Sequence, residues 1–231
     1  MNGEVMTVEA AGETLVLLTQ RAAYWPRRRT LLVADTHFGK AAAFRAGGIP
    51  VPHGTTAEGL TRLDTALRQT QARRIVFLGD FLHAKEGRAP ETLLAVTAWR
   101  AAHADVAMLL VRGNHDRRAG DPPPEVDIAC RDGPLRDPPF VFTHHPVPSG
   151  SGFVIAGHLH PGARLSGTGR VHARLACFVI GGNVAILPAF GDFTGLADID
   201  PVTDARVIVI AGDQLVEATV PSDSPSSRRM P

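Results

Sequence analysis

Short apolar runs of strand length recur along this chain, and five of them are followed at once by polar residues that can bind metal ions. These five runs cover residues 30–34, 74–78, 106–111, 140–143 and 152–156. Runs of this length between turn residues predict buried strands. In open α/β sheets, binding sites form at the carboxyl ends of strands. The pattern therefore predicts a functional site along one edge of a sheet.

Other segments predict the elements around these strands. Val5–Ala10 and residues 14–18 are expected to pair as a hairpin across the turn at Ala11 and Gly12. Thr55–Thr70 has leucines at spacings of three and four, which predicts an amphipathic helix, and residues 90–104 begin with a proline that suits a helix start. Later strands are expected at residues 171–180, 184–187, 207–210 and 215–220. We therefore expect an α/β protein with two packed sheets and helices outside.

The composition is that of an ordinary globular protein. The chain has 231 residues, of which 44% are hydrophobic and 20% charged, and this length suits one larger domain. We expect a single domain over residues 1–220 and a disordered tail over 221–231, which is rich in Pro, Ser and Arg. The net charge of +1 does not by itself indicate that the protein binds nucleic acid or a membrane.

The cysteines and the apolar segments indicate where the protein works. Cys130 and Cys177 lie in unrelated sequence contexts, which does not indicate a disulfide framework. No apolar stretch reaches the roughly 20 residues that cross a bilayer, and we expect no signal peptide. A cytoplasmic protein without membrane contact is the expectation.

The polar residues that follow the five strands form a series with the chemistry of a metal site. The series is Asp35-x-His37, Gly79-Asp80, Gly113-Asn114-His115-Asp116, His144-His145 and Gly157-His158-x-His160. Each of these motifs, taken alone, can be explained as an ordinary polar turn. Taken together, imidazole and carboxylate groups suit a pair of divalent cations that share one carboxylate. His158 and His160 are expected to face one cavity, because alternate residues of an extended strand point the same way.

In this order, the motifs resemble those of the calcineurin-like metallophosphoesterase superfamily. The resemblance implies a four-layer αββα sandwich of two mixed β-sheets flanked by helices, and phosphoester hydrolysis at a dinuclear centre. It also implies that Asp35, His37 and His160 bind one ion, that Asn114, His144 and His158 bind the other, and that Asp80 bridges the two. Manganese is the expected ion, with iron or zinc as alternatives.

The same resemblance implies a role for the residue next to the ligand Asn114. His115 is similar to the family's general acid, which protonates the leaving alkoxide, and histidine can carry such a proton near neutral pH. Asp116 is implied to orient His115 and keep it protonated. The alternative for Asp116 is that it only caps the turn that follows.

A narrower resemblance covers more of the chain. Tyr24-Trp25-Pro26, Gly48-Ile49-Pro50-Val51-Pro52 and Leu187-Pro188-Ala189-Phe190-Gly191 are similar to the ligase-associated DNA damage response endonucleases, of the PdeM type. One departure is Thr36, where that branch has Leu, and it is not at a ligand position. This resemblance implies DNA as the substrate in bacterial DNA repair, with an ATP-dependent DNA ligase and a helicase as partners.

Substrate contacts are expected from polar residues that flank the motifs. Basic side chains here can bind the phosphates of a nucleic-acid backbone, and His83 follows Asp80 closely enough to meet a substrate phosphate. The candidates are Lys40, Arg45, His83, Arg112 and Arg117, with Arg118 beside them. Two other functions stay open: a phosphatase or cyclic-nucleotide phosphodiesterase of the same superfamily, and a metal-bound scaffold without catalysis.

Overall fold

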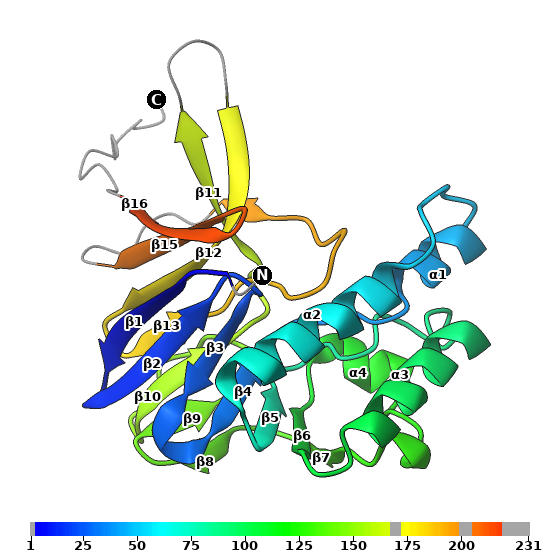
Figure 1. Cartoon of the computed structure of the whole chain (residues 1–231), viewed down its shortest axis with the longest axis horizontal. Coiled ribbons are helices and arrows are strands. Elements are labelled where there is room, and N and C mark those ends of the chain that lie inside the picture. Colours follow the sequence, from blue (N-terminus) through cyan, green and yellow to red (C-terminus); the bar gives the residue numbers. More distant parts are fainter. Residues whose placement is uncertain (1–2, 167–171, 199–204, 219–231) are drawn as a thin grey trace, which may run out of the picture.

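Two β-sheets packed face to face form the centre of the molecule (Figure 1). The computed structural model describes residues 3–166, 172–198 and 205–218. The first sheet contains, in spatial order, β1 (Val5–Ala10), β2 (Glu13–Leu18), β3 (Ala22–Trp25), β4 (Thr30–Val33), β5 (Arg74–Phe77), β6 (Ala107–Val111) and β7 (Ala129–Arg131). Strands β1 to β4 are antiparallel and joined by tight turns, whereas β4 to β7 are parallel.

The second sheet is built from the later part of the chain. Its strands are β8 (Leu135–Asp137), β9 (Phe140–Phe142), β10 (Phe153–Ala156), β11 (Pro161–Ser166), β12 (His172–Gly181), β13 (Val184–Ile186), β14 (Ala197–Asp198), β15 (Arg206–Ala211) and β16 (Gln214–Ala218). It is a mixed sheet, because β9, β10 and β13 are parallel neighbours while β12 runs antiparallel to β13 and β15. Both sheets therefore contribute parallel strands to the edge that carries the predicted ligands.

Helices cover the outer face of the first sheet. They are α1 (Lys40–Ala46), α2 (Thr55–Thr70), α3 (Pro90–Ala102) and α4 (Asn114–Ala119), with single 3₁₀ turns at η1 (Pro26–Arg28) and η2 (Pro124–Val126). Helix α2 buries Leu60, Leu63 and Leu67 against this sheet, which is the apolar face that its spacing predicts. The indole N–H of Trp99 on α3 donates to Asp64 on α2 at 2.6 Å, which ties the two helices together.

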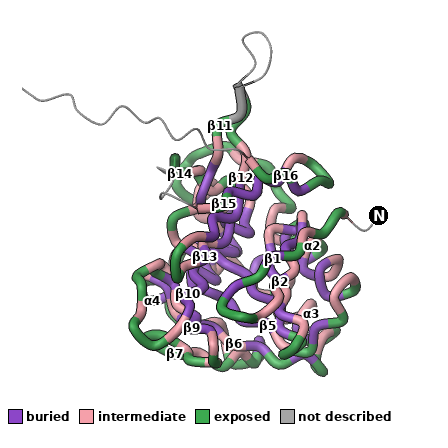
Figure 2. The backbone as a smooth tube through the Cα atoms, turned by 90° about the vertical axis from the view of Figure 1, so that its left-hand side faces the viewer, coloured by how far each residue is buried: buried purple, intermediate pink, exposed green. Residues whose placement is uncertain are grey.

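The main core lies between the sheets and is rich in aromatic side chains. Trp25 of the first sheet meets Phe140 of the second edge to face, with ring centroids 4.8 Å apart. Phe142 and Phe178 are buried in the same cluster, and Figure 2 shows the buried segments running through the middle of the molecule. Truncating a buried aromatic of this kind costs about 3–5 kcal/mol. This core fixes how the two sheets meet, and with it the relative position of their strand ends.

The fold expectation of two mixed sheets flanked by helices is confirmed, with one correction. No helix follows Val126 in the described ranges, so the expected fourth layer, helices over the second sheet, is not found there. The reason is local: β12–β13 and β15–β16 are joined by tight turns at Gly182 and Gly212, which leave no length for a helix. The predicted tail at 221–231 lies outside the described residues.

The predicted elements and their bounds agree closely in the first half of the chain. Helix α2 covers the predicted residues Thr55–Thr70, and the hairpin β1–β2 turns at Ala11 and Gly12 as expected. The short elements β3, α1, α4, β7 and β8 were not predicted. Among the described helices, none has the length and apolar character that crossing a membrane requires.

Candidate metal centre

The predicted ligands gather at one edge, where strands of both sheets end. Asp35 lies just beyond β4, Asp80 beyond β5, Asn114 begins α4 after β6, and His144 and His158 follow β9 and β10. Backbone hydrogen bonds fasten these loops to each other. The His37 N–H donates to Asp80 O at 2.8 Å and the Gly157 N–H to His144 O at 3.2 Å. The backbone itself therefore holds the ligand segments side by side.

Five of the predicted ligands have a left-handed backbone, which is rare for residues other than glycine. They are Asp35, His37, Asp80, His158 and His160, with φ of 53°, 46°, 52°, 71° and 48°. Each such residue costs about 1–3 kcal/mol and persists only where its surroundings enforce it, typically at functional sites. His158 and His160 are thus not in an extended strand, so the geometry expected for them is wrong, although both rings still reach the centre. Each turns to a different partner.

The first group of ligand atoms surrounds a carboxylate oxygen that has no hydrogen-bond donor. Asp35 is fully buried, and its Oδ2 accepts the His158 N–H at 2.8 Å. Its Oδ1 has no partner in the structure and lies 3.6 Å from His160 Nε2. His37 Nε2 is 3.4 Å from the same His160 nitrogen. A buried carboxylate oxygen without a donor is costly, and a cation between these three side chains would satisfy it.

The second group centres on His144. Its Nδ1–H donates to the Leu78 carbonyl at 2.9 Å, which leaves Nε2 free to bind a metal. That Nε2 lies 3.0 Å from Asn114 Oδ1 and 3.1 Å from His158 Nδ1. Three potential ligand atoms from three separate loops therefore converge on one point.

Asp80 stands between the two groups. Its Oδ2 is 3.5 Å from His144 Nε2 and 3.9 Å from His37 Nε2, while its Oδ1 accepts the His115 N–H at 2.9 Å. Burial raises the pKa of Asp80, and the nearby Asp35 carboxylate adds to the rise although the His115 N–H opposes it. Positive charge on both sides would stabilise the ionised form of this buried carboxylate.

The residues present fit divalent ions. Ligand atoms that share one ion at about 2.0–2.2 Å lie about 3–3.6 Å apart, and the nitrogen and oxygen separations within each group are 3.0–3.6 Å. Burial lowers the pKa of His37, His144 and His158, so these imidazoles are neutral, which is the form that binds metal. Imidazole, carboxylate and amide oxygen together suit manganese, iron or zinc.

Three glycines in the motifs make room for the ligands. A Cβ on Gly113 would collide with Asp80 Oδ1, and one on Gly79 would collide with the His144 ring. A Cβ on Gly157 would stand 2.5 Å from Asp35 Oδ2. Each of these glycines directly precedes one predicted ligand, and a side chain at its position would collide with a predicted ligand from a different loop.

His115 lies on the open side of the centre, next to His83. The His115 Nδ1–H donates to the His83 carbonyl at 2.6 Å, and the two rings are stacked with centroids 4.9 Å apart. This arrangement leaves Nε2 of His115 facing the centre, 4.0 Å from Asp80 Oδ2. His83 Nδ1 is in turn 3.4 Å from His37 Nδ1. Burial lowers the pKa of His83 to about 4, and the charge of Lys40 contributes.

Asp116 does not have the expected contact with His115. Its buried carboxylate accepts backbone N–H groups from Asp80 at 2.7 Å, Phe81 at 2.9 Å and Gly113 at 2.8 Å. The capping alternative is therefore the one that the geometry supports, and the cap also joins the loop after β5 to the loop after β6. The His83 carbonyl, rather than Asp116, orients the His115 ring.

The expected substrate contacts divide into two sets. Lys40 begins α1, and burial lowers its pKa, although the nearby carboxylates of Asp35 and Asp80 oppose this. Arg117 lines a cavity of about 510 Å³ together with His83 and His115, and it also lies 3.8 Å from Asp132. Lys40, His83 and Arg117 are therefore at the centre.

The other two candidates are engaged elsewhere. Arg112 binds Asp121 at 2.6 Å and Asp132 at 2.9 Å, and the hydrogen bonds that it donates to Asp121 raise its pKa. Arg45 lines a separate cavity of about 190 Å³ and lies 3.7 Å from Glu91. Neighbouring carboxylates largely neutralise the positive charges of Arg45 and Arg112. Their contacts therefore give no support to the predicted role in binding phosphate.

Sequence reasoning missed the loop that follows β13. The N–H groups of Phe190 and Gly191 donate to Ala34 O and Asp35 O at 2.8 and 3.0 Å, and the Ala197 N–H donates to His160 O at 3.0 Å. This loop therefore fastens two ligand segments from outside. The only signal for it in the sequence was the narrower family resemblance of residues 187–191.

Comparison with known proteins decides the family. The calcineurin-like phosphoesterase family matches residues 28–179, a span that contains all seven predicted ligands. The chain belongs to this family. Calcineurin-like phosphoesterases use divalent metal ions, and the clustered His and Asp side chains described above are the ligands that such ions take.

Solved structures add one near relative. The structure of the nuclease MPE from Pseudomonas putida is 43% identical, with a TM-score of 0.82, and the match covers 93% of this chain and 100% of that one. Two others are more distant. A protein of unknown function from Aquifex aeolicus is 18% identical, with a TM-score of 0.38, and the match covers 57% of this chain and 78% of that one. The phosphoesterase Yfce from E. coli is 16% identical, with a TM-score of 0.36, and the match covers 80% of this chain and 90% of that one. No curated protein is similar enough to this sequence to match it.

Proposed function

We propose that this calcineurin-like phosphoesterase is a dinuclear phosphodiesterase that cuts DNA as an endonuclease in bacterial DNA repair. The observation that carries the proposal is the position of Asp80, whose Oδ2 lies within 4 Å of imidazole nitrogens from both ligand groups. One carboxylate between two groups is the arrangement that a pair of ions requires. The 43% identity to a Pseudomonas putida nuclease supports a polynucleotide substrate.

The chain's own residues have distinct parts in the reaction. Two bound cations, which we expect to be manganese, would polarise the phosphoryl group and make a nucleophile available from water at neutral pH. Lys40 and Arg117 add positive charge where the phosphate enters. His115, whose ring is fixed by the His83 carbonyl, presents Nε2 on the open side and donates a proton to the leaving oxygen.

A second candidate, a phosphodiesterase for small substrates, is favoured by one observation. Arg45 and Arg112, two of the cations expected to contact a DNA backbone, are instead near acids of the same chain. A small diester needs fewer such contacts. From the narrower resemblance we also propose that the protein acts in the cytoplasm beside an ATP-dependent DNA ligase and a helicase.

The proposal is tested by substrate comparison. Metal-stripped protein is resupplied with Mn²⁺ and assayed on plasmid DNA, single-stranded DNA, a bis-nitrophenyl phosphate diester and a nitrophenyl phosphate monoester. We expect hydrolysis of DNA and of the diester, with little on the monoester. His158→Ala should abolish it, whereas His53→Ala, an exposed histidine outside the ligand groups, should match the parent.

The other outcomes identify the alternatives. Preference for the monoester would indicate a phosphatase. Hydrolysis of the diester without cleavage of DNA would favour the small-substrate phosphodiesterase. Tight metal binding without any hydrolysis would leave only the scaffold.

A further inference from the structure

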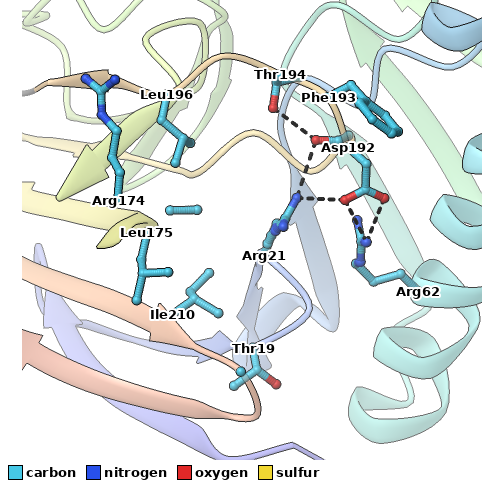
Figure 3. A pocket seen from close by; sticks show the side chains of 13 residues that line it. Thr19, Arg21, Arg62, Arg174, Leu175, Asp192, Phe193, Thr194, Leu196 and Ile210 are labelled. Carbon is cyan, nitrogen blue, oxygen red and sulfur yellow. Dashed lines mark hydrogen bonds and ion pairs between the residues drawn. The ribbon is translucent and has the colours of Figure 1, made fainter. Parts of the chain in front are cut away.

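A second cavity lies on the far side of the loop that fastens the metal ligands. It has a volume of about 450 Å³, and none of the seven predicted ligands lines it. Figure 3 shows Arg21, Arg62 and Asp192 on one side of it and Arg174, Leu175 and Leu196 on the other. A volume of this size is that of a small-molecule site.

Positive charge exceeds negative charge among the residues that line this cavity. Its lining contains three arginines and a single acid, Asp192. Arg62 donates to both oxygens of Asp192 at 2.9 and 3.0 Å, and Arg21 adds a second guanidinium to the same carboxylate at 3.1 Å. Burial lowers the pKa of Arg21, and the neighbouring charge of Arg62 lowers it further. An anion in the cavity would relieve this repulsion.

The remaining lining is apolar. Leu175, Leu196 and Ile210 contribute to the wall, and Phe193 stands at the lining with 49% of its surface exposed. Phe193 has a left-handed backbone, with φ of 57°, which the anchored neighbours Gly191 and Asp192 maintain. A cavity with guanidinium groups on two sides and an apolar wall beside them offers both kinds of surface that a nucleotide needs, one for its phosphate and one for its base.

The loop that lines the cavity also fastens the metal ligands. Gly191 lines it and donates its N–H to Asp35 O at 3.0 Å. Leu196 also lines it, and the next residue, Ala197, donates to His160 O at 3.0 Å. The cavity and the metal ligands are therefore linked through two backbone hydrogen bonds of this loop.

We propose that this cavity binds one nucleotide of a DNA strand whose scissile phosphate lies at the metal centre, with the phosphate on the arginines and the base against Leu175, Leu196 and Phe193. The proposal rests on the proposed nuclease function and gives it a second point of contact with the strand. Arg21 and Arg62 also hold the loop, through Gly191 O and Phe190 O, so substituting them would disturb the metal ligands. Within the described residues, Arg174 makes no hydrogen bond to this loop at Phe190 or Gly191.

The chain offers a matched pair for the test. Arg174 and Arg164 are cross-strand neighbours that both bind the carboxylate of Asp198, at 2.6 and 2.8 Å. Of the two, only Arg174 lines the cavity. Arg174→Gln and Arg164→Gln therefore remove the same charge from the same ion-pair group, and one of them alone removes it from the cavity.

The experiment measures binding of fluorescent single-stranded oligonucleotides to the full chain in Ca²⁺, across a salt series, with cleavage in Mn²⁺ measured in parallel. We expect Arg174→Gln to weaken binding by roughly ten- to 150-fold, as the loss of one hydrogen bond to a charged group does. The slope of log K against log salt should fall by about 0.7 for one lost phosphate contact. The ratio of oligonucleotide cleavage to small-diester hydrolysis should fall in Arg174→Gln and stay at the parental value in Arg164→Gln.

The outcomes separate this proposal from the function on which it rests. Equal binding and equal slopes in the two variants would overturn the cavity proposal while leaving the nuclease intact. A parent that hydrolyses small diesters but neither binds nor cleaves oligonucleotides would overturn the nuclease function. A Leu196→Glu variant provides a second check, because a carboxylate in the cavity should weaken oligonucleotide binding as Arg174→Gln does.

Discussion

Replacing Asp80 by asparagine should cost the protein both metal ions, whereas replacing an outer ligand should cost it one. Asp80 Oδ2 lies 3.5 Å from His144 Nε2 and 3.9 Å from His37 Nε2, so a single oxygen faces both groups. His160 belongs to the first group alone, through Asp35 and His37. The two variants therefore distinguish a shared carboxylate from an ordinary ligand.

The size of the difference follows from mass action. An ion present at 100 times its Kd stabilises the folded state by about 2.7 kcal/mol. For a chain of 150–250 residues, each kcal/mol raises Tm by about 2–4 °C. Two ions should therefore raise the Tm of the parent by about 11–22 °C over the metal-free protein. His160→Ala should retain about half of this shift, and Asp80→Asn almost none.

The metal-free proteins provide an internal check on folding. Burial raises the pKa of Asp80, so without metal its charged form destabilises the fold at neutral pH, and metal-free Asp80→Asn should be at least as stable as the metal-free parent. Asp105→Asn is the control, because Asp105 is exposed and pairs only with Arg73 in the described contacts. Thermal unfolding with and without Mn²⁺, together with metal content per chain, gives the result. Two retained ions in Asp80→Asn, or a shift equal to that of His160→Ala, would refute the bridging role.

Three further predictions follow from other parts of the site. His115→Ala should keep its metals but slow alkoxide leaving groups about 10²–10⁴-fold and nitrophenolate much less; equal rate losses on the two substrates would show that His115 is not the acid. Gly113→Ala should lower kcat about 10²-fold, because its Cβ would displace Asp80 and His144, whereas Gly150→Ala, which has open space, should match the parent in the same assay. The metal-free protein should lose stability as pH falls from 6.5 to about 4, because folding holds the pKa of His83 at about 4 and the unfolded chain takes up the proton earlier; His83→Gln should show a smaller drop in Tm, and an identical drop would contradict the assignment.

The structure brings together the residues that the sequence predicted as ligands, because their positions at strand ends depend on local pattern. A buried strand followed by a polar residue can be recognised from a few consecutive residues, as at 30–35 and 74–80. The long helix α2 shows a clear helical periodicity of its apolar residues. Helices α1 and α4 have 7 and 6 residues, too few for periodicity to distinguish them from loops. Their presence follows from the tertiary contacts of the loops that contain them.

The predictions that were wrong concern side-chain direction. Asp116 was placed against His115, but its carboxylate instead accepts the N–H groups of Asp80 and Phe81 from another loop and that of Gly113 at the start of its own helix. His158 and His160 were treated as strand residues, whereas each has a left-handed backbone that sends its ring to a different partner. The substrate role predicted for Arg112 stays untested, and its contacts give it no support because Asp121 and Asp132, neither of which is in a motif, bind it. Such contacts depend on the whole fold and leave no local pattern.

The most direct test of the central claim is a metal titration of activity. Metal-stripped protein at a concentration well above Kd is supplied with Mn²⁺ in steps, and cleavage of a single-stranded oligonucleotide is followed with the ions bound per chain. The two groups of ligand atoms that meet at Asp80 predict that cleavage rises steeply only after the first ion is bound and levels off at two per chain. Full cleavage with one ion per chain, or none with two, would contradict the account.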